Sequence, residues 1–116
     1  MTHATVREAC LALPHATEDQ PFGETVLVFR IGGKLFALLA LDVHPPTLNL
    51  KCDPEEVVER LEQYEAVGPG YHMNKRHWIT VTLDGSVPPS TVHTWIEDAY
   101  RLVRASLPKK VQEGLG

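Results

Sequence analysis

The sequence predicts one two-layer α+β domain, in which helices pack on one face of a mainly antiparallel sheet. Its 116 residues are a common length for a single domain. Short apolar segments separated by glycine and proline predict strands. A long apolar stripe near the end predicts a helix that can cover such a sheet. We therefore expect residues 1–116 to form one domain with the element order α-β-β-β-α-β-β-α.

The first predicted helix spans residues 2–13. Either Thr2 or Thr5 can cap its beginning, and Thr5 with Glu8 fits a capping box. Pro14 ends it because proline cannot continue a helix. Four apolar residues recur with the spacing of one helix face: Val6, Ala9, Cys10 and Leu13.

A β-hairpin is predicted after a polar connector at residues 15–23. Residues 25–31 are rich in β-branched and aromatic side chains, which are typical of a strand. Gly32-Gly33 can form a tight turn, because glycine readily adopts positive φ. Residues 34–41 are almost continuously apolar, so we expect this return strand to lie centrally in the sheet. A third strand is expected at residues 47–51, where polar and apolar residues alternate.

The second predicted helix spans residues 53–63. Asp53 is a favourable N-cap and Pro54 a favourable first helical residue. The helix is largely acidic, so one face should be solvated. Its predicted buried stripe is short and consists of Val57, Val58 and Leu61.

A second hairpin with a basic tip is predicted after residues 67–70, which are expected to interrupt the regular secondary structure. Residues 71–73 and 77–83 should form its strands around the turn Asn74-Lys75-Arg76. Alternation places Ile79, Val81 and Leu83 on the core face. The opposite face should carry Trp78, Thr80 and Thr82.

The last predicted helix, residues 89–107, has the strongest helical pattern in the chain. Pro108 should end it, and residues 109–116 are expected to form a frayed tail. Its stripe has seven positions: Val92, Trp95, Ile96, Ala99, Leu102, Val103 and Ser106.

Charge and composition narrow the possible functions. The net charge is −4, and residues 1–66 hold five Lys/Arg against eleven Asp/Glu. Such an acidic chain is unlike a strong nonspecific DNA binder. No long apolar run or signal peptide is visible, and two cysteines are too few for a disulfide scaffold. We expect a cytoplasmic protein with reduced thiols and no membrane association.

Catalytic and metal-binding patterns are not recognisable in the sequence. There is no phosphate-binding glycine loop, and no Ser-His-Asp arrangement can be identified from sequence order alone. His44, His72, His77 and Cys52 lack the spacing of a zinc site. We therefore predict no enzymatic activity, no metal and no cofactor.

Several stretches, together covering almost the whole chain, resemble the MmcQ/YjbR family. The most specific one runs from Gly70 to Trp78 and has the sequence Gly-Tyr-His-Met-Asn-Lys-Arg-His-Trp. The others are residues 10–14, 17–19, 21–23, 32–37, 49–54 and 107–110. The resemblance implies a fold similar to CyaY and to type III secretion chaperones, and a "double wing" motif for DNA binding. Gly32-Gly33 and Asn74-Lys75-Arg76 would then be the tips of the two wings.

Ten residues are the candidate contacts for DNA under this hypothesis. Lysine and arginine would contact phosphates, Trp78 would stack on a base, and the other polar side chains would form hydrogen bonds. The alternative is that Trp78 and Tyr71 pack at the sheet edge and that Asn74-Lys75 is only a turn. The candidates are Lys34, Asn49, Lys51, Tyr71, His72, Asn74, Lys75, Arg76, His77 and Trp78.

Two further functions remain open. A chaperone-like fold would suit an adaptor that binds a protein partner. The segment 71–78 with Asn49 and Lys51 could also form the wall of a small-molecule pocket, and a concave pocket beside Trp78 would favour that function. We expect the protein to be a monomer or a weak homodimer.

Overall fold

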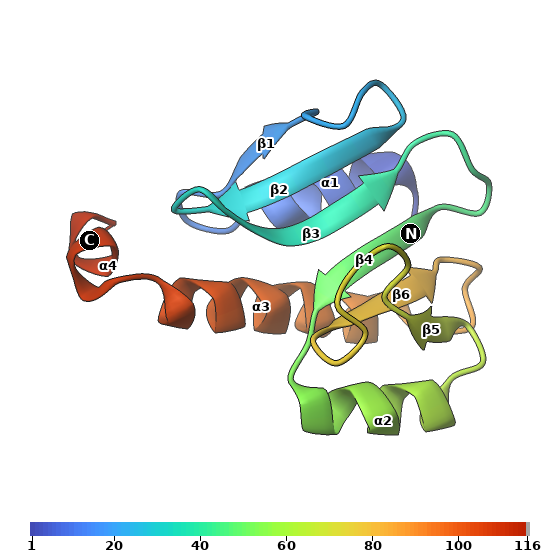
Figure 1. Ribbon diagram of the computed structural model, residues 1–116. Helices are drawn as coiled ribbons and strands as arrows, with labels where there is room; N and C mark the ends of the chain where they lie inside the picture. Colours follow the sequence, from blue (N-terminus) through green and yellow to red (C-terminus); the bar gives the residue numbers. More distant parts are fainter. Residues whose placement is uncertain (116) are drawn as a thin grey trace.

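The computed structural model describes residues 1–115 and contains one six-stranded antiparallel sheet with four helices (Figure 1). This confirms the predicted α+β class. The strand order is β1-β2-β3-β4-β6-β5. The elements are α1 (His3–Leu11), β1 (Thr17–Asp19), β2 (Val26–Ile31), β3 (Lys34–Ala40), β4 (Thr47–Lys51), α2 (Pro54–Gln63), β5 (Val67–Pro69), β6 (Trp78–Thr82), α3 (Pro89–Ser106) and α4 (Lys109–Gly114).

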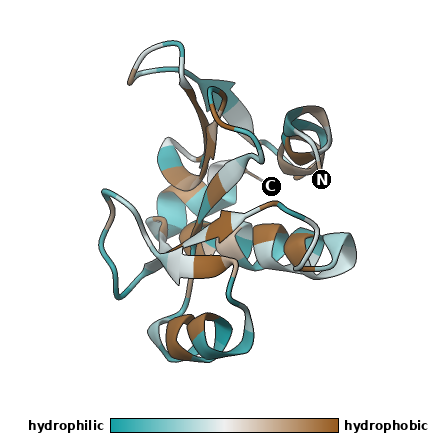
Figure 2. Ribbon diagram, turned by 90° about the vertical axis from the view of Figure 1, so that its right-hand side faces the viewer, coloured by the Kyte–Doolittle hydropathy of each residue, from teal (hydrophilic) through white to brown (hydrophobic). Residues whose placement is uncertain are grey.

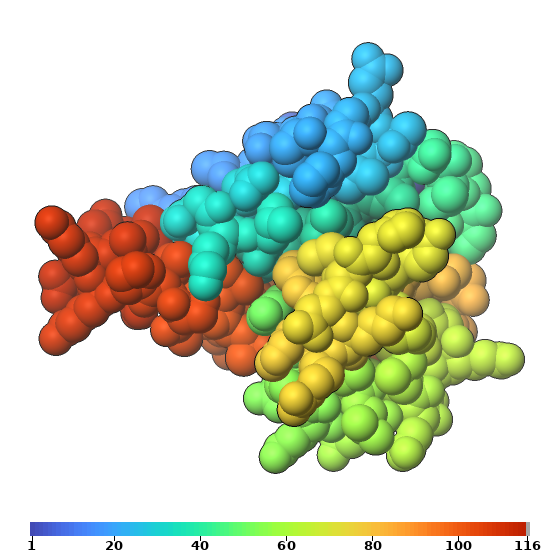
Figure 3. Space-filling view, viewed as in Figure 1, coloured from blue at the N-terminus to red at the C-terminus, as the bar shows by residue number. Residues whose placement is uncertain are grey.

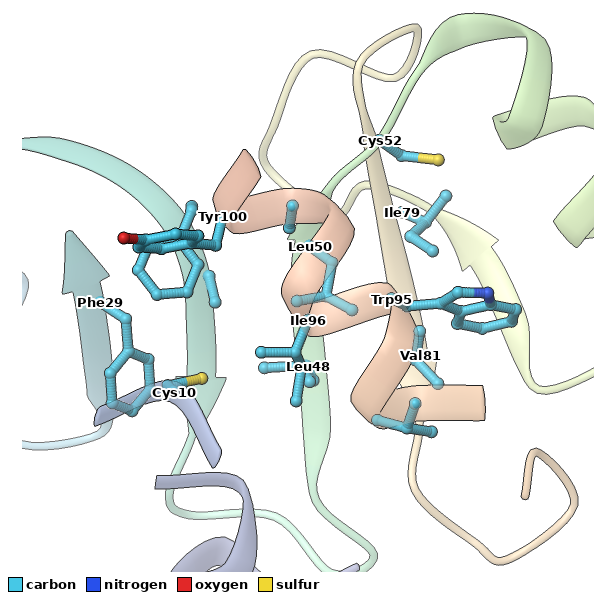
Figure 4. Close-up of a cluster of buried hydrophobic side chains, with 14 of the residues drawn as sticks. Cys10, Phe29, Leu48, Leu50, Cys52, Ile79, Val81, Trp95, Ile96 and Tyr100 are labelled. Carbon is cyan, nitrogen blue, oxygen red and sulfur yellow. The ribbon is translucent and has the colours of Figure 1, made fainter. Parts of the chain in front are cut away.

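The core lies between the sheet and helices α1 and α3. Trp95, Ile96 and Tyr100 project from α3 toward the strands, and Ile96 lies beside Leu48 and Leu50 (Figure 4). The Tyr100 hydroxyl donates a hydrogen bond of 2.7 Å to the Pro14 carbonyl oxygen, which satisfies this buried polar group. The predicted α3 stripe is therefore mostly correct. Ser106 is exposed, and Tyr100 is buried although it was not predicted to be.

The sheet face that points away from α1 and α3 is here called the outer face. Strands β4 and β6 pair in a register that places Asn49 opposite Thr80 and Lys51 opposite Trp78. Because paired residues in antiparallel strands share a face, these four side chains all belong to the outer face. The predicted division of β6 into a core face and an opposite face is confirmed.

Helix α2 begins and ends as predicted, and Val57 is buried as predicted, but the prediction for Val58 was wrong. Val58 is 57% exposed, whereas Arg60 is only 6% exposed. The Arg60 guanidinium lies 4.6 Å from the Trp95 ring centroid and pairs with Glu56 and Asp98. A flat aromatic surface and two carboxylates thus stabilise a buried cation where a purely apolar stripe was expected.

Two short strands were not predicted. β1 lies in the segment that was expected to be a connector. β5 lies in the segment that was expected to interrupt the regular secondary structure. The predicted strand at residues 71–73 is wrong, because residues 70–77 form a loop between β5 and β6. Three-residue strands carry too little periodicity to be recognised, since their pairing partners determine them.

The two ends of the chain also differ from the predictions. Thr2 is the N-cap of α1 and forms a capping box with Thr5, so the predicted Thr5–Glu8 box is wrong. Residues 109–114 form helix α4 where a frayed tail was expected, while Gly116 lies outside the described residues. The Gln112 side chain donates to the Leu107 carbonyl oxygen at 2.7 Å, which fixes α4 to the end of α3.

Hydropathy follows the layers of the fold. The hydrophobic segments in Figure 2 fall mainly on helices and strands, and the loops are mostly hydrophilic or neutral. Within residues 1–115, no helix has both the length and the apolar character needed to cross a membrane.

Candidate functional site

The loop of residues 70–77 lies on the outer face of the sheet (yellow in Figure 3), next to the surface formed by β2 and β3. Two hydrogen bonds attach it there, and a third joins the two side chains that form them. The Tyr71 amide donates to Thr80 Oγ1 at 2.9 Å, and Asn49 Nδ2 donates to the Tyr71 carbonyl oxygen at 3.1 Å. Thr80 Oγ1 donates in turn to Asn49 Oδ1 at 2.6 Å. Asn49 therefore positions the loop and is already engaged on both sides of its amide.

Glycine is required at the beginning of this loop by a close approach of the chain. A Cβ atom on Gly70 would lie 2.6 Å from Trp78 Cβ and 3.0 Å from the Trp78 carbonyl oxygen. The Gly70 amide donates to that same carbonyl at 3.1 Å. The loop is thus held against the first residue of β6, while Tyr71 and His72 remain exposed.

Trp78 is buried on the outer face and is only 7% exposed. It packs with Val28 and Leu38, and Met73 from the loop lies against this cluster. Lys51 Nζ lies 5.6 Å from the indole centroid. In this structure the Trp78 ring is covered by protein, which agrees with the alternative that Trp78 packs at the sheet edge and leaves its stacking on a base a prediction.

Basic residues gather around the end of the sheet where β2 turns into β3, which we call the basic end. Four of the eleven Lys/Arg form ion pairs within residues 1–115, namely Arg7, Arg30, Arg60 and Arg101. No carboxylate of this described part lies within 4.0 Å of the other seven. They are Lys34, Lys51, Lys75, Arg76, Arg104, Lys109 and Lys110.

Register and packing bring these seven residues to the same end. Lys34 begins β3, Lys51 ends β4, and Arg76 lies two residues before β6. The Lys34 Nζ atom lies 3.4 Å from Ser106 Oγ in the last turn of α3, the turn that also carries Arg104. Helix α4, which begins with Lys109 and Lys110, reaches the β2–β3 turn because Leu107 and Val111 lie beside Gly32.

Two of these cations influence each other directly. The pKa of Lys51 is lowered, mainly because the amine is partly buried and also because the positive charge of Lys34 is near. A lowered lysine pKa means that the positive charge of Lys51 is disfavoured in the free protein. An anion bound beside this amine would stabilise the charge and raise the pKa again.

A second feature of the outer face is an open groove of about 900 Å³. It lies toward the opposite end of the strands from the basic end, and Tyr71 and His72 of the loop form part of its wall. Val26, Leu38 and Ala40 line it from β2 and β3. The side chains of Asn49, Thr80, Thr47 and Thr82 line it from β4 and β6.

The structure divides the ten predicted site residues into three sets. Lys34, Lys51, Lys75 and Arg76 belong to the basic end. Asn49, Tyr71 and His72 line the groove. Asn74 accepts a hydrogen bond of 2.9 Å from the Arg76 amide and shapes the turn, whereas His77 is half-buried and Trp78 is buried.

Sequence reasoning missed several residues of the groove. Phe22, Asp42, Val43 and Glu65 line it from loops. The only sequence signal was that Phe22 and Val43 are large apolar residues in segments otherwise rich in proline and polar residues. Such isolated residues are common on protein surfaces, so the fold was needed to show that they meet.

Histidine and cysteine do not assemble into a metal site in the described residues. No group of three or more His, Cys, Asp or Glu side chains within residues 1–115 is placed to hold a metal ion. Cys10 and Cys52 are both buried and free. Burial raises the pKa of Cys10 to about 12 and that of Cys52 to about 11, so neither has the lowered pKa of a reactive thiol.

Comparison with known proteins shows the same architecture in relatives. The Escherichia coli O157:H7 protein YbdF, described as uncharacterised, is 37% identical over 96% of this chain and 91% of its own. The uncharacterised YjbR of E. coli K12 is 30% identical over 95% and 93%. A crystal structure from Deinococcus radiodurans, described as a DUF419 domain, superposes with a TM-score of 0.93. It is 38% identical and covers 99% of this chain and 88% of its own.

A Pseudomonas syringae protein of known crystal structure gives a TM-score of 0.76 at 29% identity, covering 89% of this chain and 99% of its own. The family model described as YjbR matches residues 11–102, which include the loop of residues 70–77 and all the residues that line the groove. The chain therefore belongs to the YjbR family.

Proposed function

We propose that this protein binds DNA phosphates through its basic end and acts as a binding protein without catalytic activity. The observation that carries the proposal is the gathering of seven Lys/Arg with no carboxylate of residues 1–115 in salt-bridge distance. Four of the predicted contacts, Lys34, Lys51, Lys75 and Arg76, are among them. Phosphate oxygens are the natural partners of such a cluster, because no carboxylate of residues 1–115 already occupies its side chains at salt-bridge distance, although Asp53 and Glu55 follow β4 at the same end.

Two chain segments would contact the nucleic acid like a pair of wings. The β2–β3 turn at Gly32-Gly33 and the loop of residues 70–77 flank the basic end. They are separated by β4, so roughly 10 Å lies between the strands that carry them. Lys75 and Arg76 are exposed on the second segment. In this proposal the contacts are electrostatic, since the indole of Trp78 is covered.

The binding should be weak and sensitive to salt. The acidic residues elsewhere in the chain give a net charge of −4, which opposes the approach of a polyanion. Two to four phosphate contacts would release a similar number of counterions. The slope of log K against log salt should then be about −2 to −4.

The test is fluorescence anisotropy with labelled single-stranded and double-stranded DNA at several salt concentrations. The variant Lys75→Gln with Arg76→Gln should weaken binding and make the salt slope shallower by about 2, because two phosphate contacts are lost. The matched control is Arg7→Gln with Arg101→Gln, which removes the same charge from two exposed residues outside the basic end.

The proposal fails if the protein does not bind at about 50 mM salt, where electrostatic binding is strong. It also fails if the two double variants weaken binding equally, because net charge alone would then explain the effect. Both pairs lie at exposed positions where charge contributes little to folding. Circular dichroism of each variant would check that the domain is intact.

A further inference from the structure

We propose that the groove on the outer face binds a small organic cation, with an apolar body in the groove and a protonated amine near its carboxylates. The groove is separate from the basic end, and this site goes beyond DNA binding. Its volume of about 900 Å³ falls in the range of pockets that hold small molecules.

The first support is the distribution of exposed apolar residues. Five large hydrophobic side chains are exposed in the described chain: Phe22, Val43, Val58, Tyr71 and Val111. Three of them, Phe22, Val43 and Tyr71, line this groove. Phe22 and Tyr71 are 63% and 69% exposed. Apolar side chains that converge from three different loops favour a binding site over scattered surface residues.

The second support is the sign of the charge in the groove. Asp42 and Glu65 line it, and no lysine or arginine does. Neither carboxylate has a cationic partner within 4.0 Å in residues 1–115. A bound amine would therefore meet an uncompensated negative charge beside either residue, whereas a phosphate or carboxylate would be repelled. This is the opposite of the preference proposed for the basic end.

The third support is the polar part of the groove lining. Asn49 and Thr80 are engaged by each other and by the loop, so they form a fixed surface. Thr47 and Thr82 face each other across β4 and β6 and also line the groove. Their hydroxyls form no hydrogen bond within residues 1–115. They can therefore accept a hydrogen bond from an ammonium group.

The experiment compares three probes that share a ring and differ in charge: naphthylmethylamine, naphthylmethanol and naphthoate. Each is titrated into ¹⁵N-labelled protein, and amide shifts are followed by NMR. The amine should bind most tightly and naphthoate most weakly at the groove. The shifts should include the backbone amides of Tyr71 and Thr80 and the side-chain amide of Asn49.

Two kinds of variant test the charge and the shape. Asp42→Asn and Glu65→Gln should each weaken amine binding about two- to fivefold, as expected for exposed ion pairs. Glu24→Gln is the matched control, because Glu24 is exposed near the same end of the sheet and does not line the groove.

Gly68→Phe should fill the groove and abolish binding while leaving the fold intact. Gly68 pairs with Thr80 on the outer face, and nothing lies within 4 Å of a Cβ placed there. The inference is overturned if naphthoate binds at the groove as well as the amine, or if none of the probes shifts groove residues at millimolar concentration. It is equally overturned if Gly68→Phe, shown to be folded by its spectrum, binds the amine unchanged. None of these outcomes would contradict the proposal that the basic end binds DNA, because that proposal is tested with different variants.

Discussion

At the scale of single residues, Trp78 shows how one side chain can change the character of a surface. An exposed tryptophan on a basic loop would favour stacking with a base. Here the indole packs with Val28 and Leu38, and Lys51 lies above it. Trp78 thus anchors the loop of residues 70–77 from below. In this position it lies between Lys51 and the loop that carries Lys75 and Arg76, at one end of the sheet.

The difference between Arg60 and Val58 shows what residue patterns cannot predict. Helical periodicity identifies which positions face the core, and an apolar residue is expected at each of them. Arg60 occupies such a position because Trp95 lies on the neighbouring helix and Glu56 lies one turn before it. The Trp95 contact and the ion pair with Asp98 join residues far apart in the sequence. No local pattern reveals them.

Cys10 leads to a prediction about alkaline pH. Burial raises its pKa from an ordinary value of 9.0 to about 12, because the thiolate is unfavourable in the core. Above pH 9 the unfolded chain loses a proton that the folded chain retains. The stability contributed by the protonated thiol is therefore complete below pH 9 and declines as pH rises toward 12.

The measurement is urea unfolding of the wild type and of Cys10→Ala from about pH 8 to about pH 11. Removing the thiol also removes its alkaline penalty. The variant should be less stable at the lower pH, and the difference should shrink as pH rises. A difference that stays constant would show that Cys10 does not remain protonated in the folded protein.

At the scale of elements, helix α3 holds the domain together through Trp95. This side chain is 7% exposed and makes an edge-to-face contact with Tyr64 at 5.5 Å between ring centroids. Trp95→Ala should lower the free energy of unfolding by about 3–5 kcal/mol. Val58→Ala on α2 is the control and should change it by less than about 0.5 kcal/mol, because Val58 is largely exposed. A loss below 1 kcal/mol for Trp95→Ala would mean that the indole is not a core residue.

Elements with their own internal signal were predicted from sequence, and elements defined by their neighbours were not. Strand β4 alternates, and α2 begins with a cap and a proline, so both were placed correctly. Strand β1 exists because it pairs with Val28, Phe29 and Arg30 of β2. The loop of residues 70–77 is bent by contacts to Asn49 and Thr80. Its shape therefore depends on Asn49, which lies 22 positions before Tyr71 in the sequence.

At the scale of the whole molecule, the lysines and arginines that lack a carboxylate partner in residues 1–115 lie toward one end of the strands, although Asp53 and Glu55 follow β4 there. The basic end lies where β4 ends and β6 begins. Glu24, Asp42, Glu65 and Asp84 lie beside the opposite ends of the strands and are all exposed. The sequence showed an acidic excess in residues 1–66, but it could not show that Lys34 and Lys51 from that half lie at the same end as Lys75 and Arg76. Only the antiparallel pairing of β3, β4 and β6 brings them together.

This polarity predicts behaviour that the net charge of −4 does not. A uniformly charged protein of that sign would be excluded from heparin, which is a dense polyanion. We expect the wild type to be retained on heparin at low ionic strength and released below about 0.2 M salt, where screening shortens the electrostatic range. Retention would show that the protein binds a polyanion although its net charge is negative.

Two variants of equal net charge separate polarity from total charge on this column. Lys75→Gln with Arg76→Gln and Arg7→Gln with Arg101→Gln each change the net charge from −4 to −6. The first pair should elute clearly earlier than the wild type, because it weakens the surface that faces the heparin. The second pair should elute close to the wild type, because Arg7 and Arg101 already have carboxylate partners. Identical elution of the two variants would mean that the protein responds only to its total charge and that the basic end is not a separate binding surface.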